Sequence, residues 1–272
     1  MTLAQGADSR VRDIQLRLVE AGYALIPDGK FGPATLTAML HKLGGPPPRV
    51  ASRLHKPDGF FSDVRGSGLF PKGLKQSQVD GINAKLTAFG NACWPVSFAA
   101  CGLATSYWET GHKMQPVREI GSGDGPDADS WDDYLEKYDT GHLAARLGNT
   151  PEADGDGVAM AGAGDVQLTG ADNFRRATVE LRKRGLIGPD VDLVKTPALV
   201  LRPDLSAWIM VLGMEHGWFT GRKLGDMLPT TRPATLTEFI ASRPIINGTD
   251  KARQIGEIAI KWQAALLLGG WA

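Results

Sequence analysis

A chain of 272 residues is long enough for one large domain, or for a small domain followed by a medium one. Lysine and arginine together number 30, as do aspartate and glutamate, so the formal net charge is zero. This balance argues against a nucleic-acid partner, because proteins that bind nucleic acids normally carry a basic excess.

The N-terminus predicts a protein made in a cytoplasm and not inserted in a membrane. Residues 1–10 are polar and lack the apolar stretch of a signal peptide, and no window approaches the length of a membrane span. Cys93 and Cys101 are the two cysteines, and their spacing fits no metal motif. We expect two reduced, mostly buried thiols.

The first 45 residues predict a helix, a loop and a second helix. Apolar side chains recur at helical spacing on both sides of the turn signal Asp28-Gly29, and Pro33 stands where the second helix would begin. The apolar positions are Val11, Ile14 and Leu18, then Leu36, Met39 and Leu43.

A stiff, polar segment follows this hairpin. Gly44-Gly45-Pro46-Pro47-Pro48 opens a run that stays polar to about Gly59, a composition that does not pack a core. We therefore predict a small domain over residues 1–45, a linker over 46–59 and one larger domain over 60–272.

Helices dominate the predicted larger domain, so the expected fold class is mainly α. One helix carries an apolar stripe from Val79 to Phe89 with Ser77 as its N-cap, and another begins near Ser97. The second places Phe98, Cys101, Thr105 and Trp108 on one face. Further helices are predicted at 171–184, 205–216 and 251–267.

Two glutamates ten positions apart are the main candidates for chemistry. On one continuous helix Glu109 and Glu119 would lie about 15 Å apart on different faces. Gly111 and Pro116 between them favour a turn that returns Glu119 across a cleft. Glycoside cleavage needs such a pair, one as acid and one as base or nucleophile.

The neighbours of the two glutamates suggest different roles. Trp108 and the apolar stripe behind it would keep Glu109 protonated, whereas Arg118 would favour the charged form of Glu119. Spacing alone leaves the ordinary reading open, in which both are solvated surface residues.

Four ordered blocks between about Leu74 and Arg253 resemble glycoside hydrolase family 19, which includes chitinases and lysozyme-like phage and bacterial enzymes. The blocks are Glu109-Thr110-Gly111 with Gln115-Pro116-Val117-Arg118-Glu119; Tyr138 and Leu147-Gly148-Asn149-Thr150 with Gly162-Ala163-Gly164-Asp165-Val166-Gln167-Leu168-Thr169-Gly170 and Asn173-Phe174; Gly217-Trp218-Phe219-Thr220-Gly221-Arg222-Lys223-Leu224; and Ile246-Asn247-Gly248.

This resemblance implies a lysozyme-like α-helical catalytic domain with a deep cleft, and an inverting reaction. It implies that Glu109 is the general acid, that Glu119 is the general base and that Thr169 helps to hold the attacking water. The residues that would line the sugar cleft are Tyr138, Gln167, Asn173 and Asn247. No cofactor and no metal are expected.

Two positions depart from the family pattern. Ala163 stands where members commonly have an arginine, and Arg253 and Arg146 are the candidates to replace it. Trp108 stands where a histidine often precedes the acid. Neither change removes a proton-transfer group.

The N-terminal segment resembles the common peptidoglycan-binding module, a small three-helix-type domain. The resemblance lies in Val11-Arg12-Asp13-Ile14-Gln15 with Leu18, Gly22-Tyr23, Asp28-Gly29-Lys30-Phe31-Gly32-Pro33 and Thr35. Tethering a hydrolase to an insoluble polymer raises its effective concentration there. We expect a monomeric endolysin whose partner is bacterial peptidoglycan, and which reaches the wall with a holin or after lysis.

Three alternatives stay open: a chitinase of the same family, a zinc amidase or peptidase, and an inactive wall-binding protein. A zinc site needs three convergent ligands, and no two histidines share a metal-motif spacing. Asp154-Gly155-Asp156-Gly157 lacks the later acidic positions of a calcium loop, and Gly162-Ala163-Gly164 lacks the third glycine of a dinucleotide site.

Overall fold

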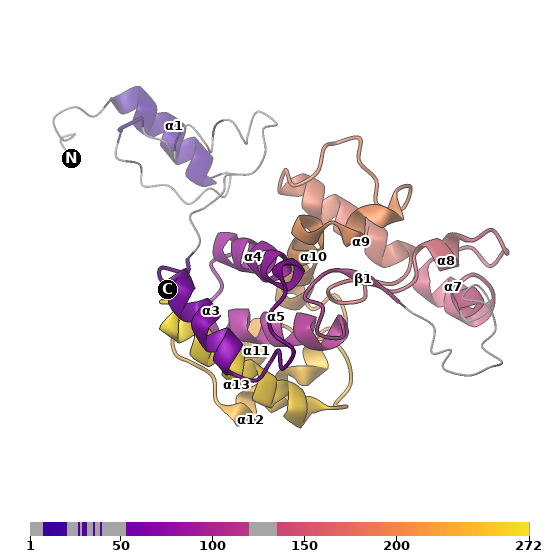
Figure 1. The fold of residues 1–272 in the computed structure, drawn as a ribbon. Coiled ribbons are helices and arrows are strands. Elements are labelled where there is room, and N and C mark those ends of the chain that lie inside the picture. Colours follow the sequence, from indigo (N-terminus) through magenta and orange to yellow (C-terminus); the bar gives the residue numbers. More distant parts are fainter. Residues whose placement is uncertain are drawn as a thin grey trace. The chain divides into compact units, whose positions relative to one another are not determined.

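The computed structural model describes residues 8–20, 27, 29–31, 35, 39, 53–119 and 135–271. The chain divides into two compact units. We call residues 1–49 with 181–190 the N-terminal unit, and residues 50–180 with 191–272 the main unit. The described residues are mainly helical and their one sheet has two short strands, which confirms the predicted fold class (Figure 1).

The N-terminal unit contains α1 (Ser9–Glu20), which confirms the first predicted helix. Gln15 on this helix is buried, and its side chain bonds to two loop residues and to the helical Thr35. Its Oε1 accepts from the Gly29 amide at 2.9 Å, and its Nε2 donates to the Lys30 carbonyl and the Thr35 hydroxyl, both at 3.0 Å. The predicted second helix lies outside the described residues except for Thr35 and Met39, which are helical.

The remaining helices and strands follow in chain order. They are α3 (Pro57–Gly66), α4 (Gln76–Asn91), α5 (Val96–Glu109), β1 (Val117–Arg118), η1 (Glu136–Tyr138), α7 (Gly141–Leu147), α8 (Asp156–Ala159), β2 (Ala163–Gly164), α9 (Ala171–Lys183), η2 (Pro197–Leu201), α10 (Pro203–His216), α11 (Leu224–Met227), α12 (Leu236–Ser242), η3 (Arg243–Ile245) and α13 (Ala252–Leu268).

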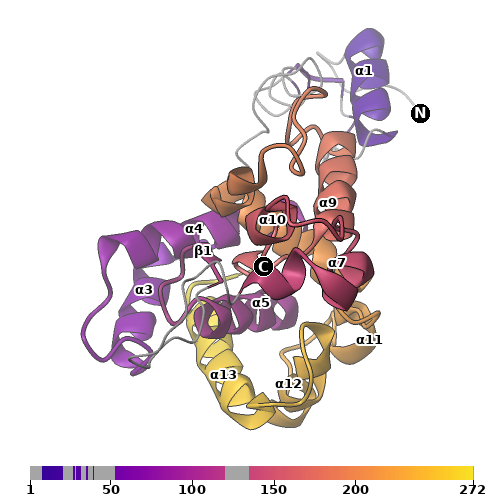
Figure 2. The same ribbon diagram turned by 90° about the vertical axis from the view of Figure 1, so that its right-hand side faces the viewer.

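Helix α5 forms the centre of the main unit. Figures 1 and 2 show it between α4 on one side and α13 on the other, and it packs on both. The sequence predicted one buried face, but every residue from Ser97 to Tyr107 is buried. Small residues on α5 allow neighbouring helices to pack closely on several sides. At Gly102, for example, a Cβ would stand 2.6 Å from the Phe89 ring of α4.

The N-cap of helix α4 lies two residues before the predicted one. The N-cap is Lys75, not Ser77, which lies inside the first turn. The side chain of Gln78 turns back and accepts from the Lys75 amide at 2.8 Å, satisfying a donor that the helix start leaves unpaired.

Residues 53–59, assigned to a linker by composition, belong to the main unit. Leu54 is buried and forms an isolated bridge with Trp271. The Lys56 amide donates to the Gly269 carbonyl at 2.8 Å, and α3 starts at Pro57. Contacts with the end of α13, more than 200 positions away, give this polar stretch a defined place.

The two thiols differ in environment. Both cysteines are free, but Cys101 is buried and Cys93 is exposed, so the expectation of two mostly buried thiols is wrong for Cys93. Cys93 has a positive φ of 54°, in a turn that ends α4 and directs its side chain outward. Burial raises the pKa of the Cys101 thiol to about 11.

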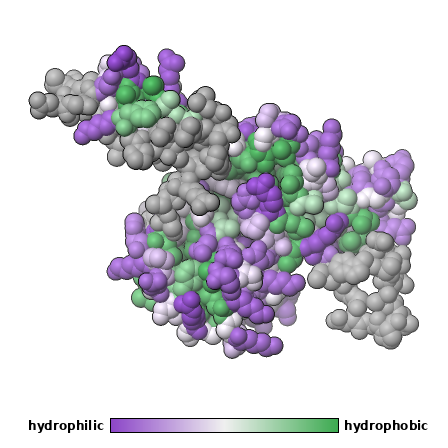
Figure 3. Space-filling model, turned by 45° about the horizontal axis from the view of Figure 1, so that its top comes forward, coloured by the Kyte–Doolittle hydropathy of each residue, from purple (hydrophilic) through white to green (hydrophobic). Residues whose placement is uncertain are grey.

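Hydrophilic side chains are spread over the face of the main unit seen in Figure 3, with smaller hydrophobic areas among them. Within the described ranges, no helix combines the length and the apolar character needed to cross a bilayer.

Candidate active site

Helix α5 ends at Glu109, as Gly111 predicted. Gly111, His112 and Met114 all adopt left-handed backbone conformations, with φ of 56°, 66° and 55°. Such angles cannot continue a right-handed helix, so the chain reverses and enters β1. The turn gives the two glutamates separate supports: Glu109 closes α5, and Glu119 directly follows β1.

Glu119 is held by two donors from distant parts of the chain. Its Oε1 accepts from the Tyr138 hydroxyl at 3.1 Å, and its Oε2 accepts from the Gly162 amide at 3.1 Å. Its own amide donates to the Gly162 carbonyl. Burial, followed by the charge and hydrogen bond of Glu119, raises the pKa of the Tyr138 phenol above 10.0. Tyr138 is therefore a stable donor at neutral pH.

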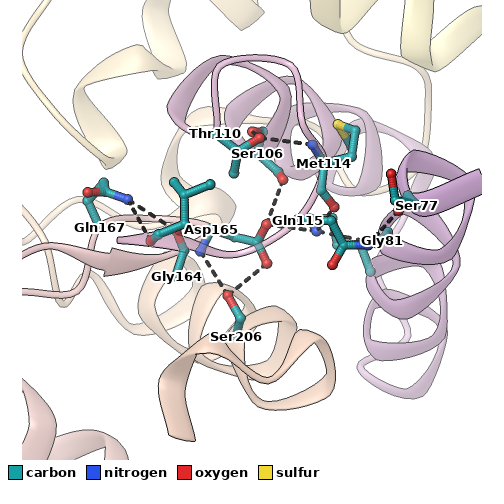
Figure 4. Close-up of polar contacts among 12 residues, drawn as sticks. Ser77, Gly81, Ser106, Thr110, Met114, Gln115, Gly164, Asp165, Gln167 and Ser206 are labelled. Carbon is teal, nitrogen blue, oxygen red and sulfur yellow. Dashed lines mark hydrogen bonds and ion pairs between the residues drawn. The ribbon is translucent and has the colours of Figure 1, made fainter. Parts of the chain in front are cut away.

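Gly162 lies in contact with both Glu119 and Gln167. A Cβ at this position would stand 2.8 Å from Gln167 Oε1 and 2.8 Å from Glu119 Oε2. The Gln167 Nε2 in turn donates to the carbonyls of Val117 at 3.3 Å and Gly164 at 3.2 Å, linking the paired strands β1 and β2 (Figure 4). Gln167 thus supports the segment that carries Glu119.

Thr169 and Asn173 continue this chain of contacts. The Thr169 hydroxyl donates to the Gln167 carbonyl at 3.0 Å, and Asn173 Nδ2 donates to the Thr169 carbonyl at 2.8 Å. Both residues are half-buried. The structure therefore links five predicted site residues through one set of contacts: Glu119, Tyr138, Gln167, Thr169 and Asn173.

Glu109 belongs to a second cluster, with an arginine that the sequence did not single out. Arg243 Nη1 lies 2.9 Å from Glu109 Oε1; the arginine side chain is 6% exposed and the glutamate side chain 17%. Arg243 Nε also donates to the Asp250 carbonyl at 3.3 Å, which fixes the guanidinium. Arg243 stands only four positions before Asn247, so its place beside the fourth resembling block was the available signal.

Among the described residues, the arginine contact predicted for Glu119 is made by Glu109 instead. Arg118 is exposed, and its Nη2 donates to the Val158 carbonyl instead of pairing with Glu119. The glutamate in an ion pair is Glu109, next to the half-buried Trp108. Strand geometry explains the difference, because neighbouring residues of an extended segment point to opposite sides.

The side chains of two predicted cleft residues have partners outside both clusters, although the Asn247 amide donates to the Arg243 carbonyl at 3.5 Å. Asn247 is exposed, and its Oδ1 accepts from the Gly248 amide. Arg253 is exposed on α13, where its partner is Glu257 one turn away. Arg146 is also exposed, on α7. The arginine that does contact a candidate glutamate is Arg243.

Three aspartates form the one group of possible metal ligands found among the described residues. Carboxylate oxygens of Asp139, Asp154 and Asp156 lie within 4.8 Å of one another. The buried Asp139 already accepts from the amides of Gly155 at 3.0 Å and Gly157 at 2.8 Å. Its role is to hold the loop before α8, and acidic clusters are common without an ion.

A surface groove of about 570 Å³ lies at the other end of α5, among residues that include Trp94, Pro95, Glu215 and Trp271. Because a helix of 14 residues is about 20 Å long, this groove is separate from Glu109. The predicted deep cleft stays a prediction, since residues 120–134, directly after Glu119, lie outside the described residues.

The site thus offers two partly exposed carboxylates on separate supports, one in an ion pair and one hydrogen-bonded to a phenol and an amide. This is a donor and acceptor set suited to proton transfer. No known protein family, no curated protein and no solved structure matches the chain.

Proposed function

We propose that the chain hydrolyses β-1,4 glycosidic bonds of bacterial peptidoglycan, with Glu109 and Glu119 as the acid and base. One observation carries the proposal. Two parts of the second block of the family resemblance, Tyr138 and the segment 162–170, converge on Glu119 of the first block through hydrogen bonds. The convergence supports a site because Tyr138 and Gly162, 19 and 43 positions from Glu119, both contact its carboxylate.

In the proposed reaction, Glu109 gives a proton to the leaving glycosidic oxygen, while Glu119 removes a proton from a water that attacks the anomeric carbon. Inversion requires carboxyls about 6.5–9.5 Å apart, so that this water fits between base and sugar. Tyr138 and Gly162 each donate once to Glu119, which leaves lone pairs on both oxygens for the water. Thr169 helps to hold the water, as the resemblance implies.

The ion pair of Glu109 with Arg243 adds a requirement to this mechanism. As the acid, Glu109 must face the leaving oxygen in the complex, whereas in the free chain its Oε1 lies 2.9 Å from the Arg243 guanidinium. We infer that sugar binding moves Glu109 away from Arg243, so that its carboxyl group faces the glycosidic oxygen. Arg243 then fixes the resting position of the carboxylate.

The same proposal gives the N-terminal unit the role of wall binding and places the action of the protein at the cell wall, after release with a holin or by lysis. The expected fold is a lysozyme-like domain behind a peptidoglycan-binding module. Loss of turbidity of purified bacterial walls tests it: the intact chain should clear walls in the presence of a chelator, and Glu109→Gln and Glu119→Gln should not.

Each alternative has its own outcome in this assay. Loss of clearing on chelation would indicate a zinc amidase or peptidase. Clearing that is equal in the intact chain and in Glu109→Gln would exclude the assignment of that residue, and stronger cleavage of chitin than of walls would indicate a chitinase. Binding without cleavage would indicate an inactive wall-binding protein.

A further inference from the structure

A buried ion pair lies between the supports of the two glutamates. Lys85 Nζ is 2.7 Å from Asp165 Oδ1, and both side chains are 0% exposed. A charged pair without solvent contact is uncommon, because removing either charge from water is costly. Neither residue belongs to the glutamate clusters described above.

Every polar group of the pair has a partner, as Figure 4 shows in part. Asp165 accepts from Ser106 on α5 and from Ser206 on α10, both at 2.8 Å, and its amide donates to Ser206 Oγ at 2.8 Å. Lys85 on α4 also donates to the carbonyls of Met114 at 3.0 Å and Gly81 at 3.3 Å.

The bonds reach both segments that determine where the glutamates lie. Met114 is in the turn between Glu109 and Glu119, and its amide donates to Thr110, the residue directly after Glu109. Asp165 follows β2, whose partner strand β1 leads to Glu119. The ammonium of Lys85 therefore anchors the turn, and the carboxylate of Asp165 anchors the strand opposite Glu119.

We propose that Lys85 and Asp165 are positioning residues that set the distance between Glu109 and Glu119; this inference rests on the proposed function. A buried pair is weak evidence for stability, since apolar replacements of similar volume are often neutral or stabilising. Its bonds are directional, however, and displacing a reacting group by about 1 Å can reduce the rate about 100-fold. The pair acts on the geometry of the site without touching the sugar.

The test is the double variant Lys85→Met/Asp165→Asn, which removes both charges and keeps similar volumes. On solubilised glycan strands of peptidoglycan we expect kcat to fall about 10- to 100-fold, with KM changed less than about threefold. The amides of Glu119 and Gly162 should exchange hydrogen at least about tenfold faster. The milder variant Ser206→Ala removes both hydrogen bonds between Ser206 and Asp165. If the double variant does not fold, Ser206→Ala should lower kcat and speed the exchange at both amides.

Gln263→Met is the matched control. Gln263 is buried and bonded to both backbone groups of Ala234, at 2.7 and 2.8 Å, but belongs to neither cluster. It should lose stability while keeping kcat within about twofold. In an active chain, a folded double variant with unchanged kcat would overturn the positioning role.

The proposed function has a separate criterion. If the intact chain releases no new sugar reducing ends, the proposed function fails, and the exchange at Glu119 and Gly162 alone decides the positioning role. If the intact chain is active, Glu109→Gln is inactive and the double variant keeps full kcat, only the positioning role fails.

Discussion

The phenol of Tyr138 and the amide of Gly162 are the groups that distinguish Glu119 from an ordinary surface glutamate. Each forms a hydrogen bond to one carboxylate oxygen, so the side chain has one preferred orientation. Glu109 obtains the same restriction from the Arg243 guanidinium. At the scale of single residues, the two carboxylates are held in place by different chemistry.

The raised pKa of Tyr138 predicts a loss of stability in alkali. Its phenol and that of Tyr107 both have pKa values above 10.0 in the folded chain, mainly because of burial. Above about pH 10 the unfolded chain loses these protons first, so the free energy of unfolding falls as pH rises. Below that pH both states keep the protons, and the phenols cause no pH dependence.

Denaturant unfolding between pH 8 and pH 11 measures this effect. We expect the decline above pH 10 to be shallower in Tyr138→Phe than in the intact chain, because one of the two phenols is gone. At pH 8 the variant should be less stable by about 1 kcal/mol, the ordinary loss for one hydrogen bond. An unchanged slope would show that Tyr138 titrates alike in both states.

The sequence identified the glutamates but not the residues that hold them. Gly111 and Pro116 showed that the helix stops after Glu109, and the blocks of the resemblance pointed to Tyr138 and Gln167. Arg243 pairs with Glu109 across 134 positions, a separation that no local pattern encodes. Nothing in the sequence marks Lys85 as buried, because lysine is almost never fully buried unless it is paired.

At the scale of elements, the main unit depends on close approaches of backbone segments. Strand β1 and the segment 162–170 meet at Gly162, and α4 meets α5 at Gly102. The helices at 171–184, 205–216 and 251–267 were predicted within two residues, because their apolar stripes are long. The predicted cap at Ser77 is wrong, because the Gln78 side chain bonds to Lys75 and the helix is capped there. The single apolar face predicted for α5 is also wrong, because α5 packs on two sides.

The approach at Gly162 predicts a strong effect of one methyl group. In Gly162→Ala the Cβ would stand 2.8 Å from both Glu119 Oε2 and Gln167 Oε1, so both side chains must move. We expect wall clearing to fall about 10- to 100-fold and the free energy of unfolding to drop by about 1–3 kcal/mol.

Gly66→Ala is the matched control for this variant. A Cβ there has nothing within 4 Å, and the residue ends α3. Clearing should be unchanged, and stability should be equal or slightly higher because alanine favours helix. Full clearing by Gly162→Ala would mean that the site tolerates a displaced Glu119 or Gln167, contrary to the proposed geometry.

At the scale of the whole molecule, binding and cleavage are assigned to different units of the chain. The net charge of zero gives no general attraction to anionic wall polymers, so the proposed function requires a specific binding surface. Gln15 is the buried polar residue that orders the loop of the N-terminal unit, through Gly29 and Lys30.

Gln15→Leu tests the division of roles. It leaves the Gly29 amide and the Lys30 carbonyl without this partner, at a cost of about 1–3 kcal/mol to the N-terminal unit. We expect co-sedimentation with purified walls to weaken several-fold, and the cleavage of soluble glycan strands to stay unchanged. Arg17→Gln, at an exposed position of α1, should change neither. Equal wall binding by all three proteins would contradict the role of the N-terminal unit.

The products of wall digestion test the central claim most directly. Mass analysis of purified peptidoglycan treated with the intact chain should show new amino-sugar reducing ends, and the first-formed anomer should be inverted. Glu109→Gln and Glu119→Gln, folded as the intact chain is, should release none above background. New amino groups without reducing ends, or equal release by either variant, would contradict a glycosidase that works through these two carboxylates.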